Sequence, residues 1–422
     1  METTRNPDKS SFNSKYALLT LGFVAFVTSF GAHVVAVNLP IYARQIGVGF
    51  AMIGALIAVY AFAEIFAKPV FGFLAGRSSL KATMLGGLAF FSLASLSYLF
   101  VDPHLLILVR FLQGLGAAAL SITSAALVAE YYPTSRGRAF GIYNSLKGAG
   151  YALSPVIGGA LVARTRFSMI FVASAIAGAL AFTLSVALPP SRKMTSKDKD
   201  DDLSFRAFAS VFRNATLLPW YGVMVANMFL VGILFGFLSV YGSSLGYGQL
   251  KNGLIVGAAT AAYLLVQPIA GSLADRIDPE RLIFEDPIPP VRLIFAGLAF
   301  SSVGIGLIPF TKGGALVAAA VLAGIGVGTV WTNTDAMVSN LTHEGRIAAT
   351  LGAAGSFKEL GDMLGPLAIG SISQLLGLKW GFVICGLLGV LALLLLRRSA
   401  LQSSTAETPT LPVKDIQQDG RP

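Results

Sequence analysis

GIYNSLKGAGYALSPVIGG, residues Gly141–Gly159, joins the features of a membrane helix to a positive charge. It is apolar and rich in glycine, yet it contains Lys147 with no acidic residue nearby in sequence. Small residues let two helix backbones approach closely, which is how helices associate in lipid, where apolar side chains gain little from burial. The segment therefore predicts a closely packed membrane helix that carries a cation.

The same pattern recurs in the second half of the chain as GAAGSFKELGDMLGPLAIG, residues Gly352–Gly370. In register, Lys147 matches Lys358 and Pro155 matches Pro366. A proline bends or interrupts a helix because it cannot donate a backbone hydrogen bond. A membrane cation and a helix-bending proline that recur together indicate two copies of one membrane unit.

The composition is that of a polytopic membrane protein. Hydrophobic residues make up 55% of the chain and charged residues 12%, whereas a soluble domain carries about 25% charged residues. The net charge of +10 does not indicate nucleic-acid binding, because the basic residues lie in short loops between apolar segments, where they set orientation. The expected fold class is all-α and membrane-spanning.

Twelve segments are long enough to cross a bilayer, which takes roughly 20 apolar residues. They are centred near Phe26, Ile57, Phe91, Ala117, Tyr151, Ala177, Leu230, Val266, Ser301, Ala323, Leu364 and Leu388. This pattern predicts six-helix bundles at residues 16–190 and 215–398, joined by a charged cytoplasmic linker at 191–214. Residues 1–15 and 399–422 are expected as cytoplasmic tails, the second disordered because its composition cannot bury enough apolar surface.

The distribution of lysine and arginine predicts the orientation. With twelve spans, both termini and the linker share one side of the membrane, and most basic residues fall on that side. Because basic loops stay in the cytoplasm, we expect a multi-pass protein of the cell membrane, plasma or inner, with both termini inside. Arg164 and Arg166, in an outer loop, run against this bias.

Three motifs stand out along the chain. GFLAGR at Gly72–Arg77, with its repeat copy GSLADR at Gly271–Arg276, resembles the loop motif of the major facilitator superfamily of transporters. RFLQGLGAAA at Arg110–Ala119 and GAGYALSPVIGG at Gly148–Gly159 resemble motifs in the fourth and fifth helices of its drug–proton antiporters. Over nearly its whole length the chain is similar to the twelve-helix drug–proton antiporter group.

The sequence departs from the family pattern at two places. The first loop motif has Gly76 where an acid is usual, whereas the second copy keeps Asp275. Ser154 precedes Pro155 where the fifth-helix motif has glycine, and the repeat copy before Pro366 keeps that glycine. The second half is therefore closer to the family pattern at both places.

The resemblance implies a secondary transporter rather than an enzyme, with two parallel repeats that rock to give alternating access. We expect proton-coupled efflux of a small apolar or amphiphilic compound. The alternative is a symporter or uniporter for an organic anion or another small nutrient, which Arg110, Lys147 and the lack of an acid in the first span favour. A receptor or regulator on the same fold is a third possibility, although the chain shows no soluble signalling domain.

The expected partners are a small-molecule substrate, protons and the lipid bilayer, with no nucleic acid and a monomeric state. The sequence has no G-x-x-x-x-G-K-[ST] motif, so ATP is not expected to drive the protein directly. It also has no His-Glu-x-x-His motif and no Cys/His cluster, so neither a cofactor nor a metal is expected.

Eight ionisable residues inside the spans are candidates for the substrate and proton pathway, because charge is costly at mid-membrane. They are His33, Glu64, Arg110, Lys147, Asp335, Lys358, Glu359 and Asp362. Simpler roles remain open for several. Arg110 could anchor the bundle by bonding backbone carbonyls, and His33 could be a packing residue. Glu64 with Lys68, and Lys358 with Asp362, are spaced to pair along one helix.

Five further residues are predicted to line a central cavity. They are Asn38, Asn227, Tyr241, Trp331 and Asn333. In the family that the motifs resemble, the first, fourth, seventh and tenth helices line the cavity. Asp335, in the patch TNTD of the tenth span, is therefore a candidate for the place where substrate and proton meet. It could instead be a hydrogen-bonded core acid.

The motif residues are expected to support the conformational change, because glycine removes bulk where helices slide and proline lacks a backbone donor. They are Gly72, Arg77, Gly148, Pro155, Gly158, Gly159, Gly271, Asp275, Arg276 and Pro366.

Depth in the membrane predicts an ion pair between Glu64 and Lys358. Each lies twelve residues inside its cytoplasmic helix end, at Gly76 and Arg346, which is about 18 Å at 1.5 Å per residue. The family resemblance implies that the second helix packs on the eleventh and the fifth on the eighth. The repeat places Tyr263 at the position of Glu64, so the matching lysine, Lys147, would lack an acid.

Overall fold

The computed structural model describes residues 7–77, 79–191, 216–275, 289–342 and 347–405. In this described part the chain is helical and contains no strand. The expected linker at 191–214 lies outside these residues except for Ser191, as does the tail beyond residue 405.

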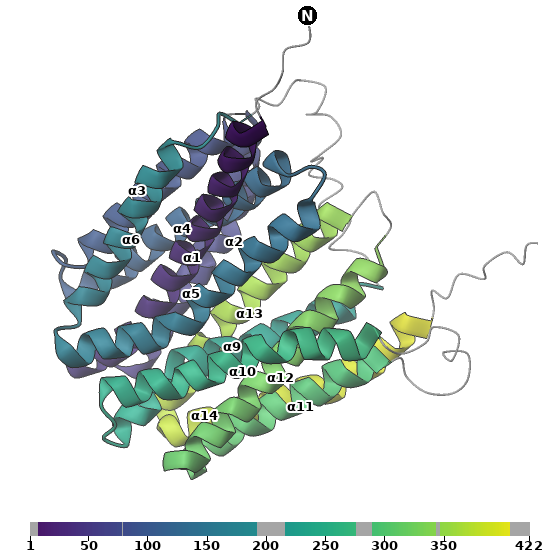
Figure 1. Cartoon of the computed structure of the whole chain (residues 1–422). Helices are drawn as coiled ribbons and strands as arrows, with labels where there is room; N and C mark the ends of the chain where they lie inside the picture. Colours follow the sequence, from purple (N-terminus) through teal and green to yellow (C-terminus); the bar gives the residue numbers. More distant parts are fainter. Residues whose placement is uncertain (1–6, 78, 192–215, 276–288, 343–346, 406–422) are drawn as a thin grey trace, which may run out of the picture.

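Twelve long helices account for the described part of the chain (Figure 1). The first six are α1 (Pro7–Gln45), α2 (Phe50–Arg77), α3 (Leu80–Ser97), α4 (Leu106–Tyr131), α5 (Arg136–Arg164) and α6 (Ser168–Val186). The second six are α9 (Leu218–Ser244), α10 (Gln249–Asp275), α11 (Pro289–Leu307), α12 (Gly313–Asn340), α13 (Ile347–Leu376) and α14 (Leu378–Thr405). Short 3-10 turns, Pro103–Leu105 and Ile308–Phe310, precede α4 and follow α11.

Among the described residues, eleven of these helices are long and apolar enough to cross a membrane. The remaining one, α13, carries the charged residues Lys358, Glu359 and Asp362 within little more than one turn. The twelve-helix fold expected from the sequence is therefore confirmed. In α1 and α14 the apolar spans cover Lys15–Gln45 and Leu378–Arg397, and both helices continue beyond them into the segments expected as tails.

The first helix of each half ends in the same way. Gly47 after α1 and Gly246 after α9 have φ values of 86° and 80°, a conformation that glycine adopts without a steric penalty. The next amide in each case reaches back five residues, from Val48 to Ala43 and from Tyr247 to Gly242. This is a Schellman motif, which satisfies carbonyl groups at a helix end, and its recurrence shows the internal repeat in the backbone.

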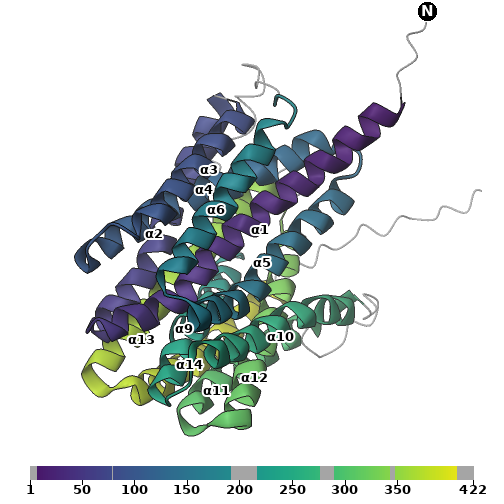
Figure 2. The same cartoon turned by 60° about the vertical axis from the view of Figure 1, so that its left-hand side comes forward.

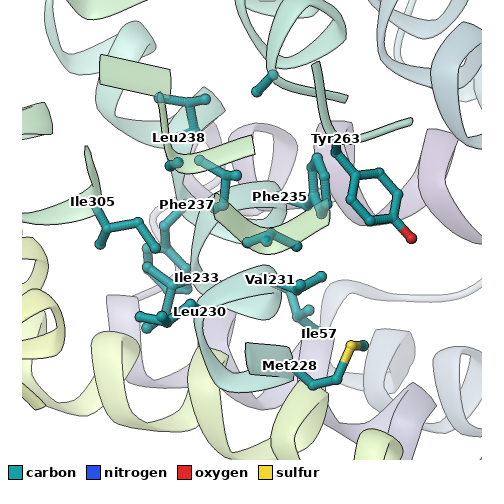
Figure 3. Packing of buried hydrophobic residues seen from close by; sticks show 14 of the residues in the cluster. Ile57, Met228, Leu230, Val231, Ile233, Phe235, Phe237, Leu238, Tyr263 and Ile305 are labelled. Atoms are coloured by element: carbon teal, nitrogen blue, oxygen red, sulfur yellow. The ribbon is translucent and has the colours of Figure 1, made fainter. Parts of the chain in front are cut away.

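The two halves pack through the helix pairs that the family resemblance implied. Helix α2 packs on α13 and α5 packs on α10, and we call these contacts the α2–α13 seam and the α5–α10 seam. Helix α9 lies between them and is the most buried span, with Ile57 of α2 and Tyr263 of α10 close to its apolar residues (Figure 3). We call the end of the bundle at which α1 begins the proximal end, and the opposite end the distal end.

Glycines bring the halves closest together near the distal end. A Cβ added to Gly159 of α5 would lie 2.6 Å from the carbonyl oxygen of Gln249 on α10, and one added to Gly370 of α13 would lie 2.6 Å from that of Phe50 on α2. Gly159 and Gly370 are matched positions of the repeat, so the same contact closes both seams. Nearby, the Ser239 hydroxyl of α9 donates to a carbonyl oxygen of α1 at 2.8 Å.

Toward the proximal end the halves separate. A Cβ added to Gly141 of α5 or to Gly355 of α13 would meet no heavy atom within 4 Å. Helices α5 and α10 lie side by side at their distal ends and diverge toward the end where α1 begins (Figures 1 and 2). The structure is thus closed by backbone contact at its distal end.

We predict that Gly159→Ala lowers the free energy of unfolding by about 1–3 kcal/mol, because the added methyl forces two backbones apart in a packed contact. Gly141→Ala in the same helix is the matched control and should be neutral or stabilising. Thermal unfolding of the detergent-solubilised protein would compare them, and equal melting temperatures would show that the seam does not depend on close approach.

Candidate functional site

A lysine joins the two halves across the α2–α13 seam. The Nζ atom of Lys68 on α2 lies 3.1 Å from Oε2 of Glu64, one turn earlier, and 2.5 Å from Oε1 of Glu359 on α13. All three side chains are largely buried. Two carboxylates therefore share one ammonium group at mid-membrane, where an unpaired charge is costly, and the pair to Glu359 ties one half of the protein to the other.

Lys358 forms a second ion pair, inside the C-terminal half. Its Nζ lies 2.6 Å and 2.7 Å from the two carboxylate oxygens of Asp335 on α12 and 4.5 Å from the ring centroid of Trp331. The predicted pair between Glu64 and Lys358 is therefore wrong, although the helices that carry them do pack together. The alternative partner, Asp362, has no ion pair among the described residues.

The error has a geometric cause. Lys358 and Glu359 are consecutive, so their side chains leave α13 about 100° apart around its axis. Glu359 reaches α2 across the seam, while Lys358 reaches α12 within its own half. Depth along a helix places both residues at the right level, but the direction around the helix decides which of them meets the other half.

Lys147 of α5 differs from the other two lysines of this region. Among the described residues it has neither an ion pair nor a hydrogen bond of its side chain, although it is partly buried. It lies close enough to Lys68, Glu64 and Glu359 for their charges to act on it. Within the described part of the chain, Lys147 therefore has no carboxylate in direct contact, unlike Lys68 and Lys358.

Arg110 belongs to a polar network inside the N-terminal half. Its guanidinium donates to Oε1 of Gln113 at 2.8 Å and to the carbonyl oxygen of Ala32 at 3.3 Å, and it lies 4.3 Å from the ring centroid of Tyr60. Gln113 also accepts from the Tyr98 hydroxyl at 3.2 Å. The bond to a backbone carbonyl of α1 is the kind of contact expected if Arg110 anchors the bundle, the simpler of its two predicted roles.

His33 packs between the two halves. Its Nδ1 donates to the carbonyl oxygen of Ser29 at 2.9 Å. Its ring centroid lies 4.0 Å from that of Tyr151 on α5 and 6.4 Å from that of Phe235 on α9. These contacts are those of a packing residue, the simpler role considered for His33.

Aromatic rings continue from His33 into the C-terminal half. Phe235 lies edge-on to Tyr263 of α10 with centroids 6.4 Å apart (Figure 3), and Tyr263 lies edge-on to Trp331 of α12 at 5.8 Å. We call His33, Tyr151, Phe235, Tyr263 and Trp331 the aromatic row. It crosses from the N-terminal to the C-terminal half and ends beside Lys358.

Two cavities accompany these groups. A small one of about 10 Å³, room for one water molecule, is lined by Asn227, Trp331 and Lys358 among others. A larger one of about 450 Å³ lies at the distal end, where α1 and α9 end and α2 and α10 begin. Its charged lining residue is Arg44, which lies 4.3 Å from the ring centroid of Phe50.

The other residues expected to line a central cavity are buried in packing contacts. Asn38 lies against Gly158 in the contact between α1 and α5 and donates to its own helix. Asn333 likewise donates within α12 and is fully buried. Tyr241 packs edge-on against Phe382, with centroids 5.7 Å apart.

The motif prolines lie at the two seams. The carbonyl oxygen of Pro155 faces Gly253 of α10, and that of Pro366 faces Gly54 of α2. In both contacts an added Cβ on the facing glycine would overlap the carbonyl oxygen. Gly148 faces α10 more loosely, since its added Cβ would lie 3.5 Å from the nearest side-chain atom.

For most residues of the two loop motifs, Gly72, Arg77 and Asp275 among them, only the helical backbone is described. Arg276 lies outside the described residues. Gly271 is in ordinary contact with a side chain of α12. Their predicted role in the conformational change therefore stays a prediction.

Lys68 and Gln113 are central to the site and were not among the candidates drawn from the sequence. A signal was present for both. Lys68 follows Glu64 by one helical turn, which suggested only a local pair, and Gln113 follows Arg110 by one turn in an otherwise apolar span. Polar residues one turn from a membrane charge are therefore informative even when they lack a motif.

The family profile described as the Major Facilitator Superfamily matches residues 21–285 and 284–418. The chain belongs to this superfamily. A relative from Methanocaldococcus jannaschii, described as an uncharacterised MFS-type transporter, is 22% identical over 390 residues, covering 90% of this chain and 98% of the relative. The quinolone resistance protein NorA of Staphylococcus aureus is 29% identical over 185 residues, covering 42% of this chain and 47% of NorA.

Solved structures share this superfamily fold. A bacterial homologue of the human lysosomal transporter Spinster, in an inward-facing and unoccupied conformation, matches with a TM-score of 0.78 at 15% identity, over 93% of this chain and 98% of that one. The nucleoside transporter NupG matches with a TM-score of 0.74 at 13% identity, over 91% and 98%. At these identities the likeness shows the fold alone.

We predict that Lys68 and Glu359 are energetically coupled. Lys68→Met or Glu359→Gln should each lower the free energy of unfolding, by up to roughly 3–5 kcal/mol where a charge is left buried and unpaired. The charge exchange Lys68→Glu with Glu359→Lys keeps two acids and one base, and should recover part of the stability lost in either single exchange. A double variant no better than the sum of its parts would contradict the cross-seam pair.

A second cycle separates the two ion pairs. The effects of Lys358→Met and Asp335→Asn on the melting temperature should be strongly non-additive, because the residues are in direct contact. Those of Lys358→Met and Glu64→Gln should be closer to additive. Coupling of Lys358 to Glu64 that exceeds its coupling to Asp335 would contradict the structure.

Proposed function

We propose that this member of the superfamily is a proton-coupled secondary transporter that exports a small apolar or amphiphilic compound by alternating access. The observation that carries the proposal is the Glu64–Lys68–Glu359 group at the α2–α13 seam. It places titratable groups on both halves, at the contact that must change when the halves move.

The group has the charge balance that proton coupling requires. Two carboxylates against one ammonium leave one negative charge over, and a proton on either carboxylate would remove it. Protonation of Glu359 would also weaken its bond to Lys68, because the Coulomb attraction between two opposite charges is lost and only a hydrogen bond from the ammonium to a neutral carboxyl group remains. Proton binding would thereby loosen the attachment of α13 to α2.

Two further observations support export. RFLQGLGAAA and GAGYALSPVIGG resemble antiporter motifs, and part of the chain is similar to a quinolone resistance protein. We also propose that the proximal end faces the cytoplasm, because most basic loop residues belong to that end. The distal closure would then be on the outer face, and the protein would act as a monomer in the cell membrane.

The alternative is a symporter or uniporter for an organic anion or another small nutrient. Lys147, which has no counter-charge among the described residues, favours it. Arg110 favours it less than its sequence position suggested, because its guanidinium already bonds Gln113 and Ala32.

A transport assay tests the proposal. A thermal-shift screen of lipophilic cations, sugars, amino acids and organic anions would first identify a ligand. In proteoliposomes, its transport should then depend on a pH gradient and stop when an ionophore collapses that gradient. We expect Glu359→Gln to keep ligand binding but lose the pH dependence, while Asp102→Asn, in an exposed distal loop, behaves as wild type.

Two outcomes would contradict the proposal. Transport that is indifferent to the pH gradient would remove proton coupling. Loss of pH dependence in Asp335→Asn but not in Glu359→Gln would move the coupling site into the C-terminal half, where Lys358 pairs with Asp335.

A further inference from the structure

The internal repeat shows why Lys147 has no counter-charge. Lys147 matches Lys358, whose acid is Asp335. Asp335 lies eleven residues after Gly324 on α12, and the residue eleven after the matching Gly114 on α4 is Ala125. The N-terminal half therefore has the lysine of this pair without the acid.

The structure supports this register. A Cβ added to Gly114 would lie 2.7 Å from the carbonyl oxygen of Tyr60 on α2, and one added to Gly324 would overlap that of Ala259 on α10. Tyr60 and Ala259 are themselves matched positions, as Glu64 and Tyr263 are one turn later. The two halves therefore share the backbone arrangement at this position, and they differ in the side chain, which is Ala125 in the first half and Asp335 in the second.

A cation at mid-membrane without a partner is costly, and such residues mark substrate pathways. Lys68 and Lys358 are stabilised because each forms an ion pair with a carboxylate. Lys147 lies one helical turn from Tyr151, so its side chain shares a face of α5 with a ring of the aromatic row. An unpaired cation therefore adjoins a series of rings that crosses between the halves.

We infer that Lys147 binds the anionic group of an aromatic substrate whose ring packs against the aromatic row. The inference rests on the proposed transport function, whether by export or by the alternative symport or uniport, and names the substrate class: an amphiphile with an aromatic body and a carboxylate or similar anion. Such a compound supplies the charge that Ala125 lacks, and offset or edge-to-face ring contacts stabilise its apolar part. Because the row includes rings from both halves, the ligand would contact both.

Asp362 on α13 would favour a substrate of the opposite charge. It is an acid of the same region without an ion pair among the described residues, and it matches Tyr151 in the repeat. A substrate selected by Asp362 would be a cation. The experiment therefore has to compare ligands that differ in charge alone.

The probes are 4-phenylbutyrate, 4-phenylbutylamine and 4-phenylbutanol, which share one body and carry negative, positive and no charge. Binding to the purified full-length protein in detergent would be measured by calorimetry at neutral pH. We expect the butyrate to bind most tightly. Lys147→Gln should weaken it about tenfold or more, the range of a lost charge-assisted hydrogen bond, and leave the alcohol unchanged.

Three variants and one control make the assignment specific. Lys147→Arg keeps the charge and should retain the preference for the butyrate. Ala125→Asp supplies the missing acid and should abolish the preference, whereas Ala125→Asn has nearly the same volume without the charge and should keep it. Lys251→Gln, at the distal end of α10, is the control for loss of a lysine elsewhere.

Equal binding of the three probes, or butyrate binding unchanged by Lys147→Gln, would overturn the inference. Tighter binding of the amine that depends on Asp362 would assign a cationic substrate instead. The measurement needs no transport and no pH gradient. Lys147-dependent binding in a protein that proves indifferent to a pH gradient would sustain this inference while rejecting the proposed coupling.

Discussion

The two halves of this transporter are held together where helix backbones touch. Inside a bilayer, apolar side chains gain little by leaving lipid, so association depends on close packing and on polar contacts. Gly159 against Gln249 and Gly370 against Phe50 supply the close packing at matched positions of the repeat. Both contacts lie toward one end, and the rest of the architecture, with halves that diverge toward the other end, follows from them.

The charged groups do not follow the same symmetry. One seam carries the ion pair from Lys68 to Glu359, and the positions that match these residues are the uncharged Gln267 and Gly148. The backbone repeat thus preserves the mechanics of two equivalent contacts, while the side chains give the two contacts different chemistry. The backbone of the two halves is therefore nearly symmetric, whereas the charged site that it holds is not.

The fold could be predicted almost completely from the sequence, because its signals are long and repeated. Twelve apolar spans predicted the helices, matched glycines and prolines predicted the repeat, and the resemblance to a known family implied the helix pairs. The ion pairs could be predicted only in part. Glu64 and Lys68 are one turn apart and pair as their spacing suggests, whereas the partner of Lys358 depends on the direction of its side chain around α13. Periodicity sets depth in the membrane, but small rotations of a helix select between neighbours such as Lys358 and Glu359.

The unequal seams affect how the halves separate. Opening the α5–α10 seam breaks van der Waals contacts between backbones, and no ion pair among the described residues crosses it. Opening the α2–α13 seam must also part Lys68 from Glu359, which requires additional work unless a proton or a ligand changes the charge there. The two seams therefore resist separation unequally. The charged α2–α13 seam is the one at which a change of charge can control whether the halves part.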